Sequence, residues 1–366
     1  MQIRAVIIMM IRLAKRSDIS NKKSMQIRIA AIILALLVVS IFLAILRLNP
    51  IMVYGTMIKG AFGSPYNIRQ TIIKAIPLLI SALGVCIAFK MKFWNIGGEG
   101  QIMMGAFGAS LIALNFPDMS KPILLILMFI SAFIFGGIWA FIPSFFRVNW
   151  KTNETITTLM MNYIALKFVT YLQYGPWKDK AALGFPKIPN FSDNATLPEI
   201  FGVHIGWIIA IIVTILVFIY LNYTKKGYEI SVIGESENTA LYSGIDIKRA
   251  ALGALFLSGA ICGIVGFLQT SGVSHTLSVE ITGGAGNTAI IVAWLANLNA
   301  IAMALVSILF AALITGANYI QTAFGIPQSA ALILQSTILF FVLGSEFFIR
   351  FKVKFASKEK KAEEVA

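Results

Sequence analysis

Long apolar runs are the feature that most constrains this sequence. They cover approximately residues 29–46, 71–89, 101–116, 122–142, 157–173, 205–222, 251–270, 286–298, 300–316 and 329–347. A helix rises about 1.5 Å per residue, so about 20 residues are needed to cross a hydrocarbon core about 30 Å thick. The chain is 58% hydrophobic and only 13% charged, whereas about 25% of the residues of a soluble domain are charged. The sequence therefore excludes a water-soluble domain and predicts an all-α, polytopic transmembrane helical bundle of about ten helices.

Two of these runs, 101–116 and 286–298, are short and lie beside clusters of glycine. Such segments are typical of broken or re-entrant elements that are buried inside membrane proteins. We therefore expect some helices of the bundle to be short or broken. The sequence leaves open whether these two runs span the membrane fully.

The positive charge is distributed unevenly along the chain. The 30 Lys and Arg residues outnumber the 16 Asp and Glu residues, giving a net charge of +14, and most of them lie in segments that would share the cytoplasmic side if the N-terminus is inside. We therefore predict a cytoplasmic basic segment at 1–28, a transmembrane domain at 29–348 and a cytoplasmic charged tail at 349–366. The charge indicates contact with anionic membrane lipids rather than nucleic acid. Because Met-Gln-Ile-Arg begins at both Met1 and Met25, the true start stays open.

Residues that could carry catalysis or bind a metal are scarce. The chain has 2 cysteines and 2 histidines, and its sequence contains neither a CxxC nor an HExxH motif. It also lacks a GxxxxGK[ST] phosphate-binding loop. We therefore expect no catalytic residues, no metal site and no cofactor bound by this chain, and we predict that it is not an enzyme.

The most distinctive local motif is Phe93-Trp-Asn-Ile-Gly-Gly-Glu-Gly-Gln101. It places the polar side chains of Asn95, Glu99 and Gln101 beside a membrane segment, where polar groups are costly unless they are paired. One interpretation is a polar pathway for a solute. The alternative is a structural turn whose glycines allow close helix packing.

A second motif, Asn153-Glu-Thr-Ile-Thr-Thr-Leu-Met-Met-Asn162, begins a predicted helix. Helix capping explains its first residues, but Asn162 lies inside the helix and must bond a neighbour or face a wet cavity. Amides favour a neutral, hydrogen-bonding solute over an ion. Aromatic residues such as Phe107 or Tyr163 could stack on a flat ring, although such residues more often serve packing.

The predicted inner loop at about 223–250 contains a third motif. Good helix formers run from Glu235 to Ser243, after Gly234, and stop at Gly244. The sequence predicts a short helix lying across the membrane surface on the cytoplasmic side. A solvated connector is the alternative interpretation.

These motifs resemble those of integral-membrane permeases of ABC importers, in the ribose, branched-chain amino acid and nucleoside branch. The resemblance is closest to nucleoside-type permeases that work with basic-membrane-protein lipoproteins. Residues 93–101 are similar to the Phe-Asn-Ile-Gly-Gly-Glu-Gly-Gln signature of that group, and residues 153–162 to its Asn-Glu-Val-Ile-Thr-Leu-Met-Leu-Asn element. Residues 234–245 resemble its coupling segment, and residues 286–297 match a further stretch more loosely.

The resemblance implies a transport role shared among several subunits. The segment at about 234–245 would couple the chain to a separate ATP-binding subunit, which would hold the ATP and Mg²⁺. An extracytoplasmic substrate-binding lipoprotein and a second related permease subunit would complete a nucleoside importer in the bacterial cytoplasmic membrane, with both termini cytoplasmic. The implied coupling residues are Gly234, Glu235, Ala240, Tyr242, Gly244 and Ile245. The candidate substrate-pathway residues are Asn95, Glu99, Gln101, Phe107, Asn162 and Tyr163.

Two alternatives stay open at this point. The same mechanism could carry a simple sugar such as ribose or galactose. An ion-coupled secondary transporter, in which Glu99 would be the titrating residue, belongs to a different class.

The coupling segment also departs from the family at Ser236, Glu237 and Thr239, where the family favours Asn, Pro and Ala.

Overall fold

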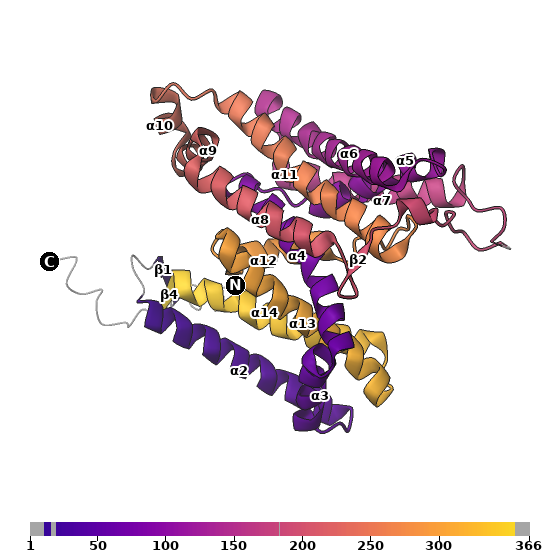
Figure 1. Cartoon of the computed structure of the whole chain (residues 1–366). Helices are drawn as coiled ribbons and strands as arrows, with labels where there is room; N and C mark the ends of the chain where they lie inside the picture. Colours follow the sequence, from indigo (N-terminus) through magenta and orange to yellow (C-terminus); the bar gives the residue numbers. More distant parts are fainter. Residues whose placement is uncertain (1–10, 16–19, 183, 356–366) are drawn as a thin grey trace, which may run out of the picture. The chain divides into compact units, whose positions relative to one another are not determined.

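The computed structural model describes residues 11–15, 20–182 and 184–355. Half of the predicted N-terminal segment and most of the predicted charged tail therefore lie outside the described residues. The chain divides into two compact units, 1–60 with 316–366, and 61–315. We call them unit 1 and unit 2 and describe each by itself (Figure 1).

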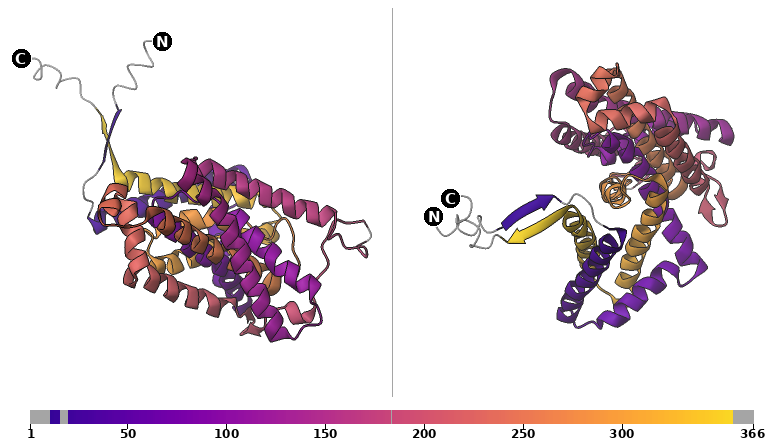
Figure 2. Two further views of the ribbon diagram at one scale, coloured as in Figure 1. Left: turned by 90° about the horizontal axis from the view of Figure 1, so that it is seen from above. Right: turned by 90° about the vertical axis from the view of Figure 1, so that its left-hand side faces the viewer.

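Unit 2 is a bundle of helices of very different lengths (Figures 1 and 2). Its helices are α4 (Pro65–Lys90), α5 (Gly98–Asn115), α6 (Lys121–Trp150), α7 (Glu154–Tyr174), α8 (Gly206–Tyr223), α9 (Lys225–Glu235), α10 (Glu237–Tyr242), α11 (Ile247–Gln269) and α12 (Ala285–Leu295). A π-helical turn, η2 (Thr270–Ser274), follows α11. Between α7 and α8 lie η1 (Asp193–Ala195) and the paired strands β2 (Glu199–Ile200) and β3 (Val203–His204). Helix α13 (Ala300–Phe324) begins in unit 2 and ends in unit 1.

Glycines bring the central helices of unit 2 into backbone contact. A Cβ atom on Gly105 of α5 would collide with the backbone of Gly263 in α11, and one on Gly136 of α6 would come within 2.6 Å of the backbone of both Gly259 and Gly263. Without a hydrophobic drive between helices in lipid, such small residues allow the close approach from which packing energy comes. Helices α5, α6 and α11 therefore form the core on which the rest of unit 2 is built.

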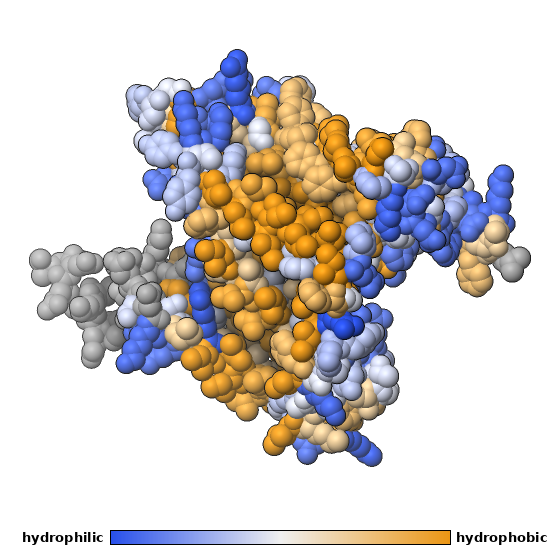
Figure 3. Space-filling model, viewed as in Figure 1, coloured by the Kyte–Doolittle hydropathy of each residue, from blue (hydrophilic) through white to orange (hydrophobic). Residues whose placement is uncertain are grey.

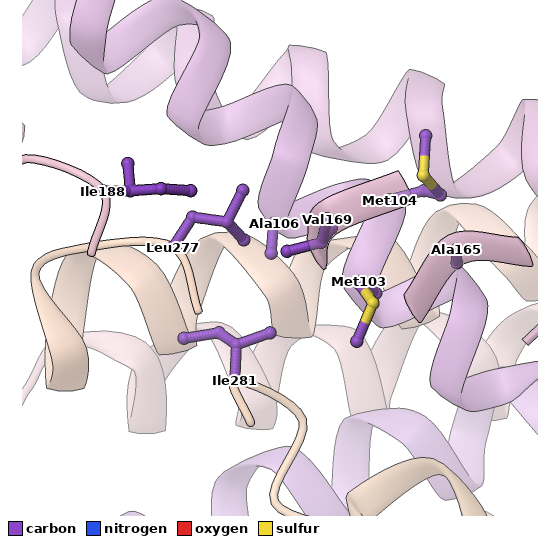
Figure 4. Packing of buried hydrophobic residues seen from close by; sticks show 8 residues of the cluster. All are labelled: Met103, Met104, Ala106, Ala165, Val169, Ile188, Leu277 and Ile281. Atoms are coloured by element: carbon purple, nitrogen blue, oxygen red, sulfur yellow. The ribbon is translucent and has the colours of Figure 1, made fainter. Parts of the chain in front are cut away.

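The segment between α7 and α8 folds back over one end of this core. The Phe191 N–H donates to the His275 carbonyl at 2.8 Å, and the Leu197 N–H donates to the Ser271 carbonyl at 2.9 Å. Ile188 is fully buried and packs with Leu277 and Ile281 against residues of α5 and α7 (Figure 4). We call residues 175–205 the cap segment.

Unit 1 contains β1 (Ile11–Lys15), α2 (Asn21–Ile45), most of α3 (Pro50–Phe62), the end of α13, α14 (Gln328–Arg350) and β4 (Phe351–Phe355). Arg28 of α2 and Glu346 of α14 form an ion pair with 3.3 Å between Nη2 and Oε2. The two strands pair antiparallel, with Ile11 opposite Phe355 (Figure 2). The segments that flank these two helices thus meet at the same end of unit 1.

The predicted fold class is confirmed. Each predicted apolar run falls mainly on one helix, and seven helices of the described chain are long and apolar enough to cross a membrane. Apolar side chains cover the exposed faces of such helices, as Figure 3 shows for the visible side. The run at 286–298 forms only the 11-residue helix α12, as expected for a broken element. Helix α3 and the strand pair β1–β4 were not predicted.

Candidate functional site

The loop between α4 and α5 is organised around the buried amide of Asn95, which is 1% exposed. Its Oδ1 accepts hydrogen bonds from the Gly97 N–H at 3.0 Å and from Gln101 Nε2 at 2.9 Å. Its Nδ2 donates to Gln101 Oε1 at 3.3 Å and to Ser258 Oγ of α11 at 3.2 Å. Both lone pairs and both N–H groups of this amide are therefore used within the protein. Asn95 and Gln101 hold the loop to α11.

Helix α7 holds the same loop from the other side. Thr158 Oγ1 accepts from the Ile96 N–H at 3.2 Å, and Asn162 Nδ2 donates to the Ile96 carbonyl at 2.9 Å. Asn162 Oδ1 also accepts from the Gly100 N–H at 2.8 Å, which is one of the N–H groups that the first turn of α5 leaves without a helical partner. The polar side chain of Asn162 inside α7 is thereby explained, because it binds the start of α5.

Glu99 lies where two helices begin. It stands in the first turn of α5 and is half-buried, and its Oε1 accepts from the N–H of Asn287 in the first turn of α12 at 3.1 Å. Gly98 and Gly286 let the two backbones touch, because a Cβ on Gly98 would come within 3.3 Å of the Gly286 Cα. A carboxylate between two helix N-termini is stabilised by both macrodipoles. Glu99 therefore links α5 to the short helix α12.

The two aromatic candidates, Phe107 and Tyr163, lie on α5 and α7. Phe107 stacks on Trp177 of the cap segment, with ring centroids 5.4 Å apart and planes at 20°, and it meets Phe135 and Phe168 edge-on. One face of its ring is thus already covered by protein. Tyr163 lies on α7 beside Asn162 and is 56% exposed.

A separate aromatic cluster adjoins the loop. Trp94 stacks on Trp294 of α12, with centroids 5.6 Å apart, and both rings contact Phe89 at the end of α4. No sequence pattern predicts that these residues meet. The cluster joins the far end of α12 to α4, so α12 is held at both of its ends.

The predicted coupling segment, at about 234–245, contains the end of α9 and the whole of α10. Gly234 lies inside α9, where a Cβ would collide with the carbonyl of Lys90, and Ala240 of α10 is fully buried. Glu235 is exposed, and Tyr242 is 94% exposed. The Lys226–Glu229 ion pair, at 2.8 Å in α9, raises the pKa of Lys226.

The sequence predicted a single helix from Glu235 to Ser243, and the structure interrupts it at Ser236. Ser236 is the N-cap of α10 and accepts from the Thr239 N–H at 3.3 Å, so α10 begins at Glu237. Its end agrees with the prediction, because Gly244 takes a positive φ of 73° and the Ile245 N–H donates to the Ala240 carbonyl at 3.0 Å. Such a glycine ends a helix without strain.

The structure therefore brings Asn95, Gln101 and Asn162 together and places Glu99 beside them. Within the described residues, no group of three or more His, Cys, Asp or Glu side chains could hold a metal ion. Sequence reasoning missed Ser258, Thr158 and Gly286 as partners of this loop. Of these three, only Gly286 could have been found from the sequence, because clusters of glycine occur at the start of both short apolar runs.

Residues 67–343 match the family described as branched-chain amino acid transport system / permease component. The chain belongs to this family of permease components. It is therefore a multi-pass membrane permease, and its expected membership among ABC-transporter permeases is confirmed.

Three curated relatives are similar over most of their length. The glucose ABC transporter permease protein TsgB13 of Haloferax volcanii is 30% identical, over 90% of this chain and 89% of that protein. The nucleoside ABC transporter permease protein NupB of Lactococcus lactis is 30% identical over 88% and 92%. The guanosine ABC transporter permease protein NupP of Bacillus subtilis is 29% identical over 81% and 86%.

Proposed function

We propose that this chain is the permease subunit of a nucleoside importer in the bacterial cytoplasmic membrane. A separate subunit would hydrolyse ATP and dock on α9 and α10. Two of the relatives above are named for nucleosides or guanosine, which supports the choice of solute. A second permease would complete the pore, and a substrate-binding lipoprotein would deliver the solute.

The observation that carries the proposal is the exposed tip of α10. Leu241 and Tyr242 are 61% and 94% exposed, directly after the fully buried Ala240. Large apolar and aromatic side chains presented on a fixed base are typical of the anchors that fill a pocket on a partner protein. We call Leu241 and Tyr242 the α10 tip. Its docking would let ATP binding and hydrolysis shift the permease between outward- and inward-facing states.

The proposed orientation follows from charge. Lys225 and Lys226 begin α9, and Lys248 and Arg249 lie in the first turn of α11, directly after α10. Short basic segments of this kind remain in the cytoplasm. The α10 tip and both termini would then lie on the cytoplasmic side. The cap segment would face outward, where a lipoprotein delivers solute.

The contacts of the loop divide the proposed pathway residues into two groups. Asn95, Gln101 and Asn162 use their amides on the protein itself, and Phe107 is covered by Trp177 on one face, so these residues would shape the path. Glu99 and Tyr163 are partly exposed and are the members of the set that would contact the solute.

A simple sugar is the second candidate solute, because the relative with glucose in its name is 30% identical over 90% of this chain. Uptake should be measured in proteoliposomes that hold the permease pair, the ATP-binding subunit and the lipoprotein. We expect labelled guanosine to enter when ATP is present and excess glucose not to compete. Uptake driven by an ion gradient without ATP would contradict the proposal.

The docking role is tested by Tyr242→Ala, with Tyr174→Ala as the matched control. Tyr174 is 64% exposed at the end of α7, far along that helix from the 93–101 loop. Truncating a well-packed aromatic anchor costs about 2 kcal/mol or more of binding. We expect Tyr242→Ala to co-purify at least about tenfold less ATP-binding subunit and to lose uptake, while Tyr174→Ala retains the subunit. Equal retention by both variants would contradict docking at the α10 tip.

A further inference from the structure

Between η2 and α12 the chain has no regular secondary structure. We call residues 275–284 the irregular segment. Its backbone makes turn-type hydrogen bonds, from the Ile281 N–H to the Ser278 carbonyl at 3.3 Å and from the Gly283 N–H to the Glu280 carbonyl at 3.0 Å. Gly283 and Gly284 both have positive φ, 55° and 77°. Unlike a helix, such a segment leaves backbone N–H and C=O groups without regular internal partners.

The irregular segment runs alongside α5. At its start, Thr276 Oγ1 donates to the Ile188 carbonyl of the cap segment at 2.9 Å. Just after its end, Gly286 contacts Gly98 at the first turn of α5. Between these points, Leu277 and Ile281 pack with Met103 and Ala106 of α5 (Figure 4). Helix α5 has 18 residues and so measures about 27 Å, close to the thickness of the hydrocarbon core. A segment that runs alongside α5 would therefore lie at the depth of the membrane.

One side of this segment is buried and the other is exposed. Leu277 and Ile281 are 1% and 4% exposed, whereas Glu280, Gly283 and Gly284 are exposed, as is Asn287 in the first turn of α12. In hydrocarbon, each unpaired backbone group costs several kcal/mol, and a carboxylate costs more. Irregular backbone at membrane depth is therefore tolerated only inside protein or beside water.

We infer that the exposed side of the irregular segment, with Glu280 and Asn287, lines the aqueous path along which the solute crosses. This inference rests on the proposed function and extends it, because it assigns the path to residues outside the 93–101 loop. A neutral solute with several hydroxyl groups, such as a nucleoside, would exchange its water for the Glu280 carboxylate, the Asn287 amide and nearby backbone carbonyls. Glu99 lies next along the path, since it accepts from the Asn287 N–H.

The inference is tested by reaction with a water-soluble, negatively charged methanethiosulfonate reagent. The native thiols of Cys86 and Cys262 are fully buried, so the unaltered chain provides an unreactive background. Glu280→Cys and Asn287→Cys would be made in the assembled transporter in membrane vesicles. The matched control is Ile215→Cys, because Ile215 is 53% exposed on α8 among other exposed apolar side chains and should face lipid.

We expect both path variants to react at least about tenfold faster than Ile215→Cys, because only a thiol in contact with water ionises and meets the charged reagent. We also expect guanosine, delivered by the lipoprotein, to slow the reaction of Asn287→Cys. Path variants that react no faster than Ile215→Cys would overturn the inference, whether lipid or the second permease covers the segment. Protection by glucose instead of guanosine would contradict the proposed solute and leave the path in place.

Discussion

Two pairs of membrane helices in this protein differ in what surrounds them. In unit 2, 78% of the apolar stretch is buried for both α4 and α11, whereas in unit 1 the value is 17% for both α2 and α14. Hydrophobicity does not explain the difference in burial. Helix α2 is the most apolar of the four, yet it is as little buried as α14. The central helices of unit 2 instead meet through glycines. Apolar length thus identifies a membrane helix, and small residues identify which helices pack against protein.

The largest expected effect comes from filling the glycine contacts of unit 2. In Gly263→Leu the new side chain would collide with the Ala132 carbonyl and with Gly136, and neither backbone can move aside. We expect a loss of more than about 3 kcal/mol, seen as aggregation during size-exclusion chromatography in detergent.

Two control substitutions complete this comparison. Gly253 in α11 and Gly344 in α14 have no atom within 4 Å of a new Cβ, so Gly253→Leu and Gly344→Leu should elute as the unaltered protein does. If Gly344→Leu aggregates as severely as Gly263→Leu, the contrast between the two helix pairs is incorrect.

A smaller effect, confined to unit 2, is expected from acid. Burial, with a contribution from His275, lowers the pKa of His204 from 6.5 to about 4, and its Nδ1 accepts from the Gly206 N–H at 3.2 Å. The unfolded chain therefore binds a proton at a higher pH than the folded chain does. The contribution of neutral His204 to the free energy of unfolding is fully present above pH 6.5. It is lost as the pH falls toward 4, and the loss reaches about 3 kcal/mol.

Tryptophan fluorescence can follow this loss. All 6 tryptophans lie between residues 94 and 294, so their emission reports on unit 2. The thermal midpoint measured by emission in detergent should fall between pH 7.5 and pH 4.5, and His204→Gln should fall by less. An equal fall in His204→Gln would exclude His204 as the cause.

The smallest effect concerns the ion pair of unit 1. The Arg28 and Glu346 side chains are 29% and 11% exposed, so Glu346→Ala should cost about 1–2 kcal/mol by leaving a half-buried arginine without its carboxylate. The swap Arg28→Glu with Glu346→Arg should restore most of this loss. Helix content measured by circular dichroism during heating is the suitable probe, because unit 1 has no tryptophan. Failure of the swap to restore stability would mean that packing, not charge, joins these helices.

Much of the fold could be predicted because apolar periodicity is local information. Each apolar run became a helix, and the glycine-flanked run at 286–298 became the short α12. Helix α3 was missed because Gly55, Lys59 and Gly60 interrupt the apolar sequence of its 13 residues, Pro50–Phe62. The β1–β4 pair depends on residues at opposite ends of the chain, which no local pattern connects.

At the candidate site, too, the sequence could not show contacts between residues that lie far apart along the chain. The sequence of the motif at 93–101 predicts a polar turn, which could line a solute pathway or serve helix packing. Its partners Ser258, Asn162 and Asn287 lie far away along the chain, so the sequence could not show that its amides are already used by the protein. Phe107 was a candidate for stacking on a solute because the sequence does not show what its ring packs against. In the structure its ring stacks on Trp177.

The pairing of β1 with β4 restricts the number of times that the chain between them crosses the membrane. Two hydrogen-bonded strands cannot lie on opposite sides of a bilayer, so the chain between them must cross an even number of times. The seven long spans are an odd number, and the total stays odd if α5 and α7 also cross, while α3 is too short to add a crossing. The irregular segment followed by α12 is the described stretch that remains to make the last crossing. We therefore expect one passage through the bilayer to be only partly helical, and it is the passage that also carries Glu280 and Asn287.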